Sequence, residues 1–283
     1  MSKIIILLSA KRCGSTAIFN LFQKHSDVKI LNKNQNIINW EPQFWTYAVE
    51  AINGRVNDFN YRVHHTLGVE KIFLKNNYKE ECIFKLFDII LNKFGPTIFD
   101  KSPQYLGSME SMELLIKYKK KRPNVEFIFF SFIRNPLDAI TSQFELWSHY
   151  TNEKNLKCRE LDWLKKYKNL EYLQKKIKIK LYKYEDFCGD PKKFTIDLMH
   201  YCKLQFSENL YSHLIIKSVG RYYVTPYKKI KDWKISSEMK SHIRKYGYDF
   251  KNRAAISFLQ KLKILLSSLK RKLVPTYEKF FKK

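Results

Sequence analysis

Two long apolar runs and a third, alternating one dominate the hydrophobic pattern of the chain. They are residues 3–9 (KIIILLS), 125–133 (VEFIFFSFI) and 178–184 (KIKLYKY). A strand covered on both faces needs apolar residues at successive positions, whereas a strand with one wet face alternates. The runs therefore predict strands, and the helical spacing between them predicts an α/β fold with an open, mostly parallel sheet flanked by helices.

Shorter elements fill the intervals between these runs. Short strands are expected at 28–31 and 97–99, and residues 40–94 lack an alternating strand pattern, which favours helices and loops there. Helices are expected from Ser15, whose hydroxyl would cap the first one, over 109–121, from Pro136 to about His149, over 159–176, and after Asp190 as the cap of the last.

The charge of the chain is strongly positive. Its 283 residues include 53 Lys and Arg against 27 Asp and Glu, a formal net charge of +26. Such an excess favours anionic partners, among them nucleotides, nucleic acid and acidic membrane surfaces. Lysines spread over solvated faces by a biased composition would give the same total, so charge alone selects no function. The 45% hydrophobic content is enough for the core of one α/β domain, with or without an appendage.

The five cysteines form no C-x-x-C pair, and their odd number argues against a disulfide framework and a structural zinc site. A reducing compartment, the cytoplasm, is the expectation. The apolar run 4–8 is too short to cross a membrane, and Lys11 and Arg12 follow it where a signal peptide would have a cleavage site of small residues.

The first candidate for chemistry is the loop between the first strand and the first helix. Backbone N–H groups in such a turn converge on one point, the helix adds partial positive charge, and cationic and hydroxyl side chains can reach a bound anion. The loop therefore predicts a P-loop-like phosphate-binding turn, with a plain strand-to-helix turn as the alternative. Its residues are Lys11, Arg12, Cys13, Gly14, Ser15 and Thr16.

Three known kinds of phosphate loop do not fit these residues. A nucleotide-hydrolysing P-loop needs Lys directly after its last Gly and another Gly five residues earlier, and Gly14 has neither. The dinucleotide fingerprint G-x-G-x-x-G is absent. A cysteine phosphatase loop would need Arg six residues after Cys13, where Phe19 stands.

The loop instead resembles the 5'-phosphosulfate loop of sulfotransferases that use 3'-phosphoadenosine-5'-phosphosulfate (PAPS). That family's pattern is approximately Pro, a basic residue, Ser, Gly and two hydroxyl residues. In this chain Lys11 replaces the Pro, Arg12 takes the basic position, Cys13 replaces the Ser, and residues 14–16 (GST) match.

A second segment resembles the 3'-phosphate motif of the same family, a strand followed by Arg, Asp or Asn, Pro, and then Asp and Ser at fixed spacing. The residues in register are Arg134, Asn135, Pro136, Asp138 and Ser142. An arginine at the end of a strand can bind a phosphate through two parallel hydrogen bonds, and Ser142, two helical turns on, could reach the same anion.

Three weaker resemblances follow in the family's order. They are residues 100–106 (DKSPQYL), 181–194 (LYKYEDFCGDPKKF) and 218–250, the last being similar to the family's loop over the cofactor and a closing Gly-Tyr. In that loop Arg221 would approach the 3'-phosphate. The resemblance thus implies a sulfotransferase that moves a sulfuryl group from PAPS to an acceptor hydroxyl, leaves 3'-phosphoadenosine-5'-phosphate (PAP), and uses no metal.

The resemblance also implies roles in catalysis. Arg12 would neutralise the leaving phosphate, and Lys101 would assist or be a simple loop lysine. Glu41 lies where some carbohydrate sulfotransferases of this kind have their catalytic Glu, among Trp40, Phe44 and Trp45, which could stack on a sugar. His64 and His65 are the rival bases.

Acceptor and rival functions stay open at this point. A carbohydrate or glycolipid hydroxyl is favoured, while a tyrosyl peptide or a small metabolite would fit the same motifs. A non-enzymatic nucleic-acid-binding protein would explain the charge but neither phosphate motif, and a nucleotide kinase lacks its Gly-Lys pair.

A basic amphipathic helix is predicted at 254–283, after a sulfotransferase domain at 1–253. Its apolar stripe would be Ile256, Leu259, Leu262, Leu266 and Leu269, with lysines between. This tail either packs on the domain or holds the protein, peripherally, at an anionic membrane.

Overall fold

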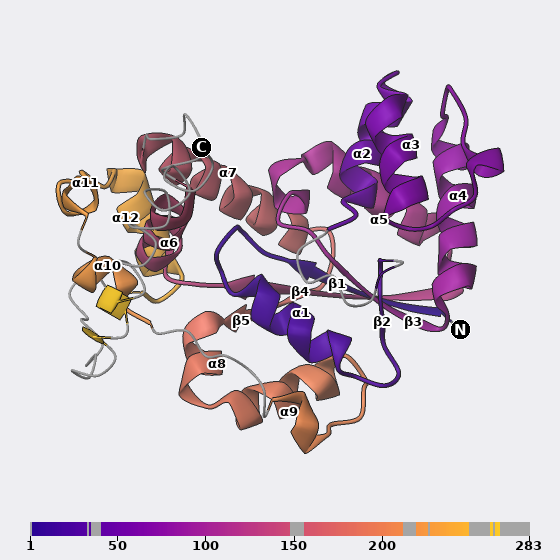
Figure 1. Ribbon diagram of the computed structural model, residues 1–283. Coiled ribbons are helices and arrows are strands. Elements are labelled where there is room, and N and C mark those ends of the chain that lie inside the picture. The colour runs from indigo at the N-terminus through magenta and orange to yellow at the C-terminus, as the bar shows by residue number, and fades with distance from the viewer. Residues whose placement is uncertain are drawn as a thin grey trace, which may run out of the picture.

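A five-stranded parallel sheet forms the centre of the molecule in the computed structural model (Figure 1). The structure describes residues 2–32, 34, 41–147, 156–211, 219–225, 227–248, 261–262 and 264–266, with only the backbone of Ile72. The strand order is β2-β3-β1-β4-β5, and every neighbouring pair is parallel. The strands are β1 (Ser2–Leu8), β2 (Lys29–Ile30), β3 (Thr97–Lys101), β4 (Val125–Ile133) and β5 (Ile179–Lys183).

The apolar run of β1 is buried on both faces, as its pattern predicted. Ile4, Ile6 and Leu8 pack into one hydrophobic core, and Ile5 and Leu7 pack into a second core on the opposite face. Because successive side chains of a strand point to opposite faces, both sets of positions must be apolar. The predicted α/β fold with an open parallel sheet is confirmed.

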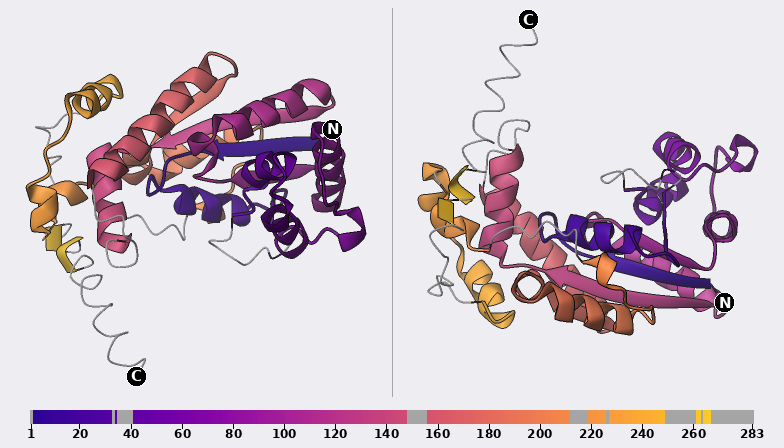
Figure 2. Two further views of the ribbon diagram at one scale, coloured as in Figure 1. Left: turned by 90° about the horizontal axis from the view of Figure 1, so that it is seen from above. Right: turned by 60° about the horizontal axis from the view of Figure 1, so that its bottom comes forward.

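Helices cover both faces of the sheet (Figure 2). One core takes side chains from α1 (Ser15–Gln23), α8 (Tyr184–Gly189) and α9 (Pro191–Tyr201). The other core takes side chains from α5 (Met109–Lys121) and α7 (Leu156–Gln174). Because helices cover both faces, a ligand can reach the sheet at the ends of its strands.

Two further groups of helices rise beyond the sheet in Figure 1. One group comprises α2 (Phe44–Ile52), α3 (Val56–His65), η1 (Lys71–Phe73) and α4 (Glu80–Phe94). The other comprises α6 (Pro136–Trp147), α10 (Arg221–Val224), α11 (Lys228–Lys231) and α12 (Ser237–Lys245). Short 3-10 turns lie at η2 (Tyr105–Gly107) and η3 (Glu208–Leu210). The expectation of helices and loops is confirmed over the described residues 41–94.

The two predicted helix caps have different outcomes. Asp190 caps α9, its carboxylate accepting the N–H of Lys193 at 2.9 Å, as expected. Ser15 is not a cap, because α1 begins one residue earlier than a Ser15 cap would need. Gly14 is the cap residue; it has a left-handed backbone conformation and no side chain that could accept an N–H of the first turn.

The predicted tail lies largely outside the described residues. Residues 261–262 and 264–266 are helical there, and Ile264 is buried while Leu262 and Leu266 are exposed. The buried side of this short piece is therefore not the predicted stripe. In the described part of the chain, none of the helices has the length and apolar character that a membrane span requires.

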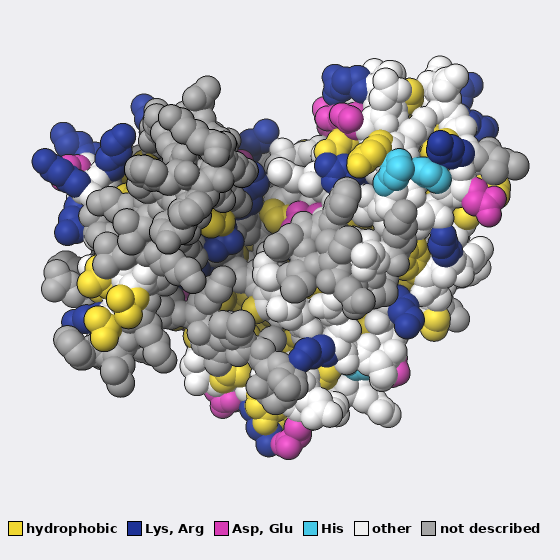
Figure 3. All heavy atoms as spheres, in the orientation of Figure 1, with side chains coloured by type: hydrophobic (Ala, Val, Ile, Leu, Met, Phe, Trp, Pro, Cys, Tyr) yellow, Lys and Arg dark blue, Asp and Glu magenta, His cyan; other side chains and the backbone are white. Residues whose placement is uncertain are grey.

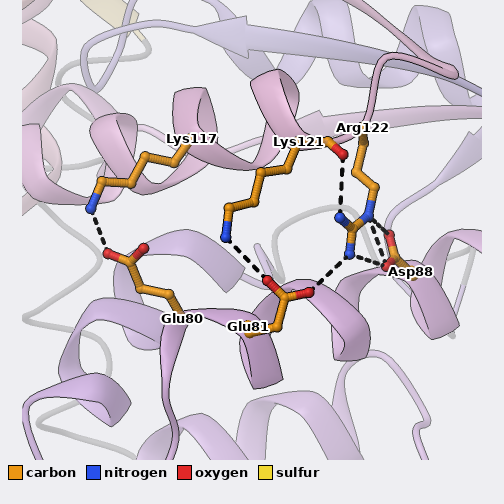
Figure 4. A network of polar contacts seen from close by, with 6 residues as sticks. All are labelled: Glu80, Glu81, Asp88, Lys117, Lys121 and Arg122. Carbon is orange, nitrogen blue, oxygen red and sulfur yellow. Dashed lines mark hydrogen bonds and ion pairs between the residues drawn. The ribbon is translucent and has the colours of Figure 1, made fainter.

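A network of ion pairs joins α4 to α5 (Figure 4). Arg122 donates to the Asp88 carboxylate through Nε and Nη2, which lie 3.0 and 2.7 Å from Oδ2. Tyr118 donates its hydroxyl to Asp88 at 2.6 Å. Exposed lysines pair with Glu80 and Glu81 nearby. The bidentate, half-buried contact is the strong member of this network, and it fixes α4 against the sheet helix α5.

We expect Arg122→Ala to lower the free energy of unfolding by about 1–2 kcal/mol, because the half-buried Asp88 loses a charged hydrogen-bond donor. Urea denaturation measures the change. Lys117→Ala is the matched control: Lys117 forms an exposed pair with Glu80 on the same two helices, and its loss should leave the midpoint unchanged. Equal effects of the two substitutions would contradict the ranking.

Candidate functional site

The topology of the sheet creates a crevice at the carboxyl ends of β1 and β4. These strands are neighbours, yet the chain leaves β1 through α1 toward β2 and leaves β4 through α6 and α7 toward β5, at the opposite edge. Connections that diverge in this way open a space between the strand ends, and ligands of α/β proteins bind there. Both motifs that the sequence singled out follow these two strands.

The loop after β1 has the backbone of an anion-binding turn. Arg12 and Gly14 have positive φ angles of 67° and 96°, on either side of Cys13. Alternation of this kind turns successive N–H groups toward one side, and the first N–H groups of α1 have no acceptor within their own helix. The loop and the start of α1 together present donors to the crevice.

The loop and the second motif contact each other directly. Arg12 donates through Nε to the Ser142 hydroxyl at 3.3 Å, and Arg134 donates through Nη1 to the Arg12 carbonyl at 3.2 Å. These contacts join segments that lie more than a hundred residues apart in the chain. Arg12, Arg134 and Ser142 therefore lie in one site, although Ser142 turns to Arg12 rather than to Arg134.

Arg134 is buried and surrounded by groups that favour its charge. Its guanidinium lies 3.7 Å from the Asp138 carboxylate and 4.5 Å from the centre of the Tyr184 ring. Burial disfavours the charged form, but Asp138, Tyr184 and Glu185 outweigh it, and the pKa of Arg134 is raised. A permanent, preorganised positive charge thus lies at the end of β4.

Helix α6 also holds the segment 220–225, which the sequence placed over the cofactor. Asp138 accepts the N–H groups of Gly220 and Tyr222, at 2.5 and 2.9 Å. Glu145, two turns further, pairs with Arg221 and accepts the Thr225 hydroxyl. Arg221 is therefore near the site but bound to a buried carboxylate, a partner that the sequence analysis missed because it lies 76 residues away.

Glu185, from the segment resembling Y-E-D, connects three parts of the chain. Its carboxylate accepts the Asn135 N–H at 3.0 Å and the Tyr248 hydroxyl at 2.8 Å. Asn135 in turn accepts the Leu137 N–H at the start of α6. Burial raises the pKa of Glu185. No role was predicted for this residue, and its contacts hold in position the strand end that carries Arg134.

Glu41 and Lys101 form an ion pair beside the loop. Lys101 Nζ lies 2.5 Å from Glu41 Oε1, and its ammonium lies 5.7 Å from the centre of the Phe19 ring of α1. Both residues are largely buried. Two candidates from separate segments are thus brought together next to the helix that the loop begins.

The aromatic residues beside Glu41 do not form the expected sugar platform. Phe44 and Trp45 are fully buried and pack on each other and on Phe87 in the core of the α2–α4 group. Apolar burial explains this placement, since the aromatic face of α2 points inward. Trp40 lies outside the described residues.

The rival bases His64 and His65 lie at the end of α3 and make contacts of their own. His64 Nδ1 bonds the Val69 carbonyl at 2.9 Å, and His65 packs on the Tyr61 ring. Arg62 of the same helix donates to the Glu41 carbonyl at 3.3 Å. The helix therefore approaches Glu41 through Arg62, while His64 bonds the turn that follows the helix.

Cys13 is buried within the loop, and its thiol points toward α7. Its Sγ lies 3.6 Å from the Tyr167 hydroxyl of α7. Burial raises the pKa of its thiol to about 11, so the group is uncharged near neutral pH. Cys13 therefore contributes its backbone and its packing to the loop, while Lys11 and Thr16 are half-exposed and Ser15 is buried.

The space-filling view in Figure 3 shows a notch between the group of α2, α3 and α4 and the part of the molecule around α7. Dark-blue Lys and Arg side chains lie on both sides of this notch. The arrangement suits an anionic ligand that approaches between the two helical groups.

Comparisons with known proteins agree with this arrangement. The sequence matches the model of the sulfotransferase family over residues 4–208. The fold is similar to a sulfotransferase domain from the Synechococcus PCC 7002 olefin synthase and to one from the curacin biosynthetic pathway. Each is 15% identical with a TM-score of 0.57, and the matches cover 88% of this chain and 95% and 99% of those domains. A search of curated proteins finds no significant match.

We expect Gly14→Ala to destabilise the protein by about 2–4 kcal/mol, since it adds a steric clash to a strained backbone. A Cβ at Gly14 would lie 2.5 Å from the Tyr184 ring and 2.8 Å from the Phe132 ring. Gly54→Ala is the control, because Gly54 also has a positive φ, of 88°, but open space around it. Its cost should be about 1 kcal/mol, the backbone part alone. Thermal unfolding of both variants measures the difference, and equal losses would remove the argument for close packing at the loop.

Proposed function

The chain belongs to the sulfotransferase family, and on that premise we propose that it transfers a sulfuryl group from PAPS to the hydroxyl of an acceptor. One observation carries the proposal: the two arginines of the two phosphate motifs meet at the crevice between β1 and β4, through Arg12, Arg134 and Ser142. A ligand with anionic groups at both ends suits such a pair of adjacent sites.

The residues at the crevice fit PAPS in number and chemistry. The loop and the start of α1 offer N–H groups, hydroxyls and Arg12 to a phosphosulfate, and Arg134 with Ser142 offers charge and a hydroxyl to the 3'-phosphate. Arg221, held by Glu145, would approach the same phosphate from the segment 220–225. When bound, PAPS supplies an activated sulfuryl group.

The proposed catalysis rests on positive charge and one base. Sulfuryl transfer, like phosphoryl transfer, spreads negative charge over peripheral and leaving oxygens, so fixed cations lower the barrier. Arg12 neutralises the charge that develops on the leaving phosphate. Lys101, at the end of β3, assists with its own positive charge. Glu41, next to Lys101 at 2.5 Å, accepts the proton of the acceptor hydroxyl.

The acceptor that we propose is a carbohydrate or a glycolipid hydroxyl, on the resemblance of the Glu41 segment to that of carbohydrate sulfotransferases. The tail at 254–283, if it binds an anionic membrane, would bring a cytoplasmic enzyme to a lipid-linked acceptor. A transfer assay with labelled PAPS over a panel of acceptors, beginning with carbohydrates, identifies the substrate.

The burial of the site's arginines favours a small ligand over nucleic acid. Arg134 and Arg221 are only 5% exposed. Proteins that bind nucleic acid through its phosphates present their Lys and Arg on an open surface. PAP should therefore raise the melting temperature with little dependence on salt, while ATP with Mg²⁺ and DNA should not. Stabilisation by DNA with a steep salt dependence would contradict the proposal.

We expect Arg134→Ala to weaken PAP binding by about 1.5–3 kcal/mol, the contribution of a hydrogen bond to a charged group, and Ser142→Ala by about 0.5–1.5 kcal/mol. Calorimetric titration measures both. Arg122→Ala removes an arginine outside the site and should bind PAP as the wild type does. Unchanged affinity in a folded Arg134→Ala variant would remove the assignment of the 3'-phosphate.

We expect Glu41→Gln to lower kcat by about 10² to 10⁴ while PAP affinity stays nearly constant, as loss of a general base does. Steady-state transfer assays and a PAP titration give the two quantities. His64→Ala and His65→Ala are the controls and should retain turnover. Retained turnover in Glu41→Gln, with a loss in either histidine variant, would move the role to that histidine.

A further inference from the structure

A second carboxyl group lies beside the Glu41–Lys101 pair. Asp100 precedes Lys101 in β3, opposite Ile6 of β1, and its side chain is about 1% exposed. Successive strand residues point to opposite faces, so Lys101 reaches Phe19 of α1 while Asp100 points to the face covered by α2 and α5. Glu41 comes just before α2 and pairs with Lys101 at the end of β3, so its charge also acts on Asp100.

The hydrogen bonds of Asp100 are incomplete for an ionised carboxylate. Tyr105 donates its hydroxyl to Oδ2 at 2.8 Å, whereas Oδ1 is buried and has no hydrogen-bond partner among the described residues. Tyr105 is itself fully buried, and its hydroxyl donates to Oδ2. A proton on Asp100 therefore belongs on Oδ1.

The groups that act on Asp100 come from three segments. They are Tyr105 of η2, Lys101 of β3 and Glu41 before α2. Burial is the largest influence and disfavours the charge, as does the negative charge of Glu41. The Tyr105 hydroxyl and the backbone N–H and ammonium of Lys101 favour the charge, but burial outweighs them and the pKa of Asp100 is raised to about 7. Asp100 thus changes its charge near neutral pH.

The charge of this cluster depends on Asp100. With Asp100 protonated, the ammonium of Lys101 and the carboxylate of Glu41 balance. With Asp100 ionised, one net negative charge lies in a poorly solvated place, next to the crevice that must receive an anionic donor. Since opposite charges attract most strongly where water is excluded, the ionised form weakens what Lys101 can do for an anion.

We propose that Asp100 is a positioning residue of the acceptor site, and that transfer is fast while its carboxyl is neutral and slows when it ionises. The proposal rests on the proposed function of Glu41 and Lys101. Asp100 touches neither donor nor acceptor; it acts by setting the charge around Lys101 and Glu41. Asp100 supports transfer in its neutral form, whereas Glu41, as the base, must be ionised to accept a proton.

The test compares the pH dependence of transfer in the wild type and two variants. Between about pH 6.5 and about pH 8.5 the wild-type rate should fall about tenfold or more, as one carboxyl ionises. Asp100→Asn imitates the neutral form and should keep the wild-type rate at the lower pH and lose the fall. Tyr105→Phe keeps the carboxyl but removes a donor that favours its charge, so the fall should move to higher pH. A purely structural role would lower the rate at every pH without moving the profile.

A second measurement, without substrate, reports the titration of Asp100 by itself. The unfolded carboxyl ionises at its ordinary pKa near 4, while the folded one holds its proton up to about pH 7. Between these values the folded protein binds the extra proton, so stability falls as pH rises and is lowest above about pH 7. The melting temperature of the wild type should follow this slope, and that of Asp100→Asn should lack it.

The outcomes separate the claims. If the wild type and Asp100→Asn show the same pH profile of transfer, the proposal is overturned, even where the melting temperatures show that Asp100 titrates. A loss of the fall in Asp100→Asn, with its shift in Tyr105→Phe, supports it. Failure of the proposed function looks different: the wild type then transfers no label from PAPS at any pH, while the melting temperatures still report Asp100.

Discussion

The buried charge of Arg134 is the constraint on which the site depends. A guanidinium inside a protein is stable only where carboxylates, carbonyls or aromatic faces surround it, and here these come from the Asp138 carboxylate, the Arg12 carbonyl and the Tyr184 ring. The loop after β1, the first turns of α6 and the start of α8 must therefore converge on the end of β4. Gly14 makes this approach feasible, because the rings of Tyr184 and Phe132 leave no room for a Cβ.

Much of this arrangement was predictable from the sequence, for a physical reason. Strands buried on both faces leave unbroken apolar runs, and parallel strands place their carboxyl ends at one edge of the sheet. Arg12 and Arg134 come after two such runs, and the pairing of β1 with β4 brings them into contact at this edge. The sequence had shown their resemblance to the phosphate motifs of sulfotransferases, the family to which the chain belongs.

The sequence was a poor guide where a residue's partner is distant or its burial decides its role. Glu145 belonged to no motif, and its partner Arg221 lies 76 residues away. Asp100 opened the segment 100–106 that resembles a family motif, but it became notable only through its burial. Phe44 and Trp45 misled for the opposite reason: aromatic residues beside a candidate base have the same pattern whether they line a site or fill a core. Ser15 missed its cap by one position, within the usual uncertainty of a helix start.

The contact between Asp138 and the segment 220–225 has a consequence for how this protein can vary. Asp138 accepts the backbone N–H groups of Gly220 and Tyr222 rather than side-chain groups. Gly220 is constrained by its own positive φ, of 86°, but at position 222 any residue except proline supplies the same N–H. Drift at that position can therefore retune what the segment presents to a ligand, such as its size or polarity, while the attachment to α6 persists unaltered.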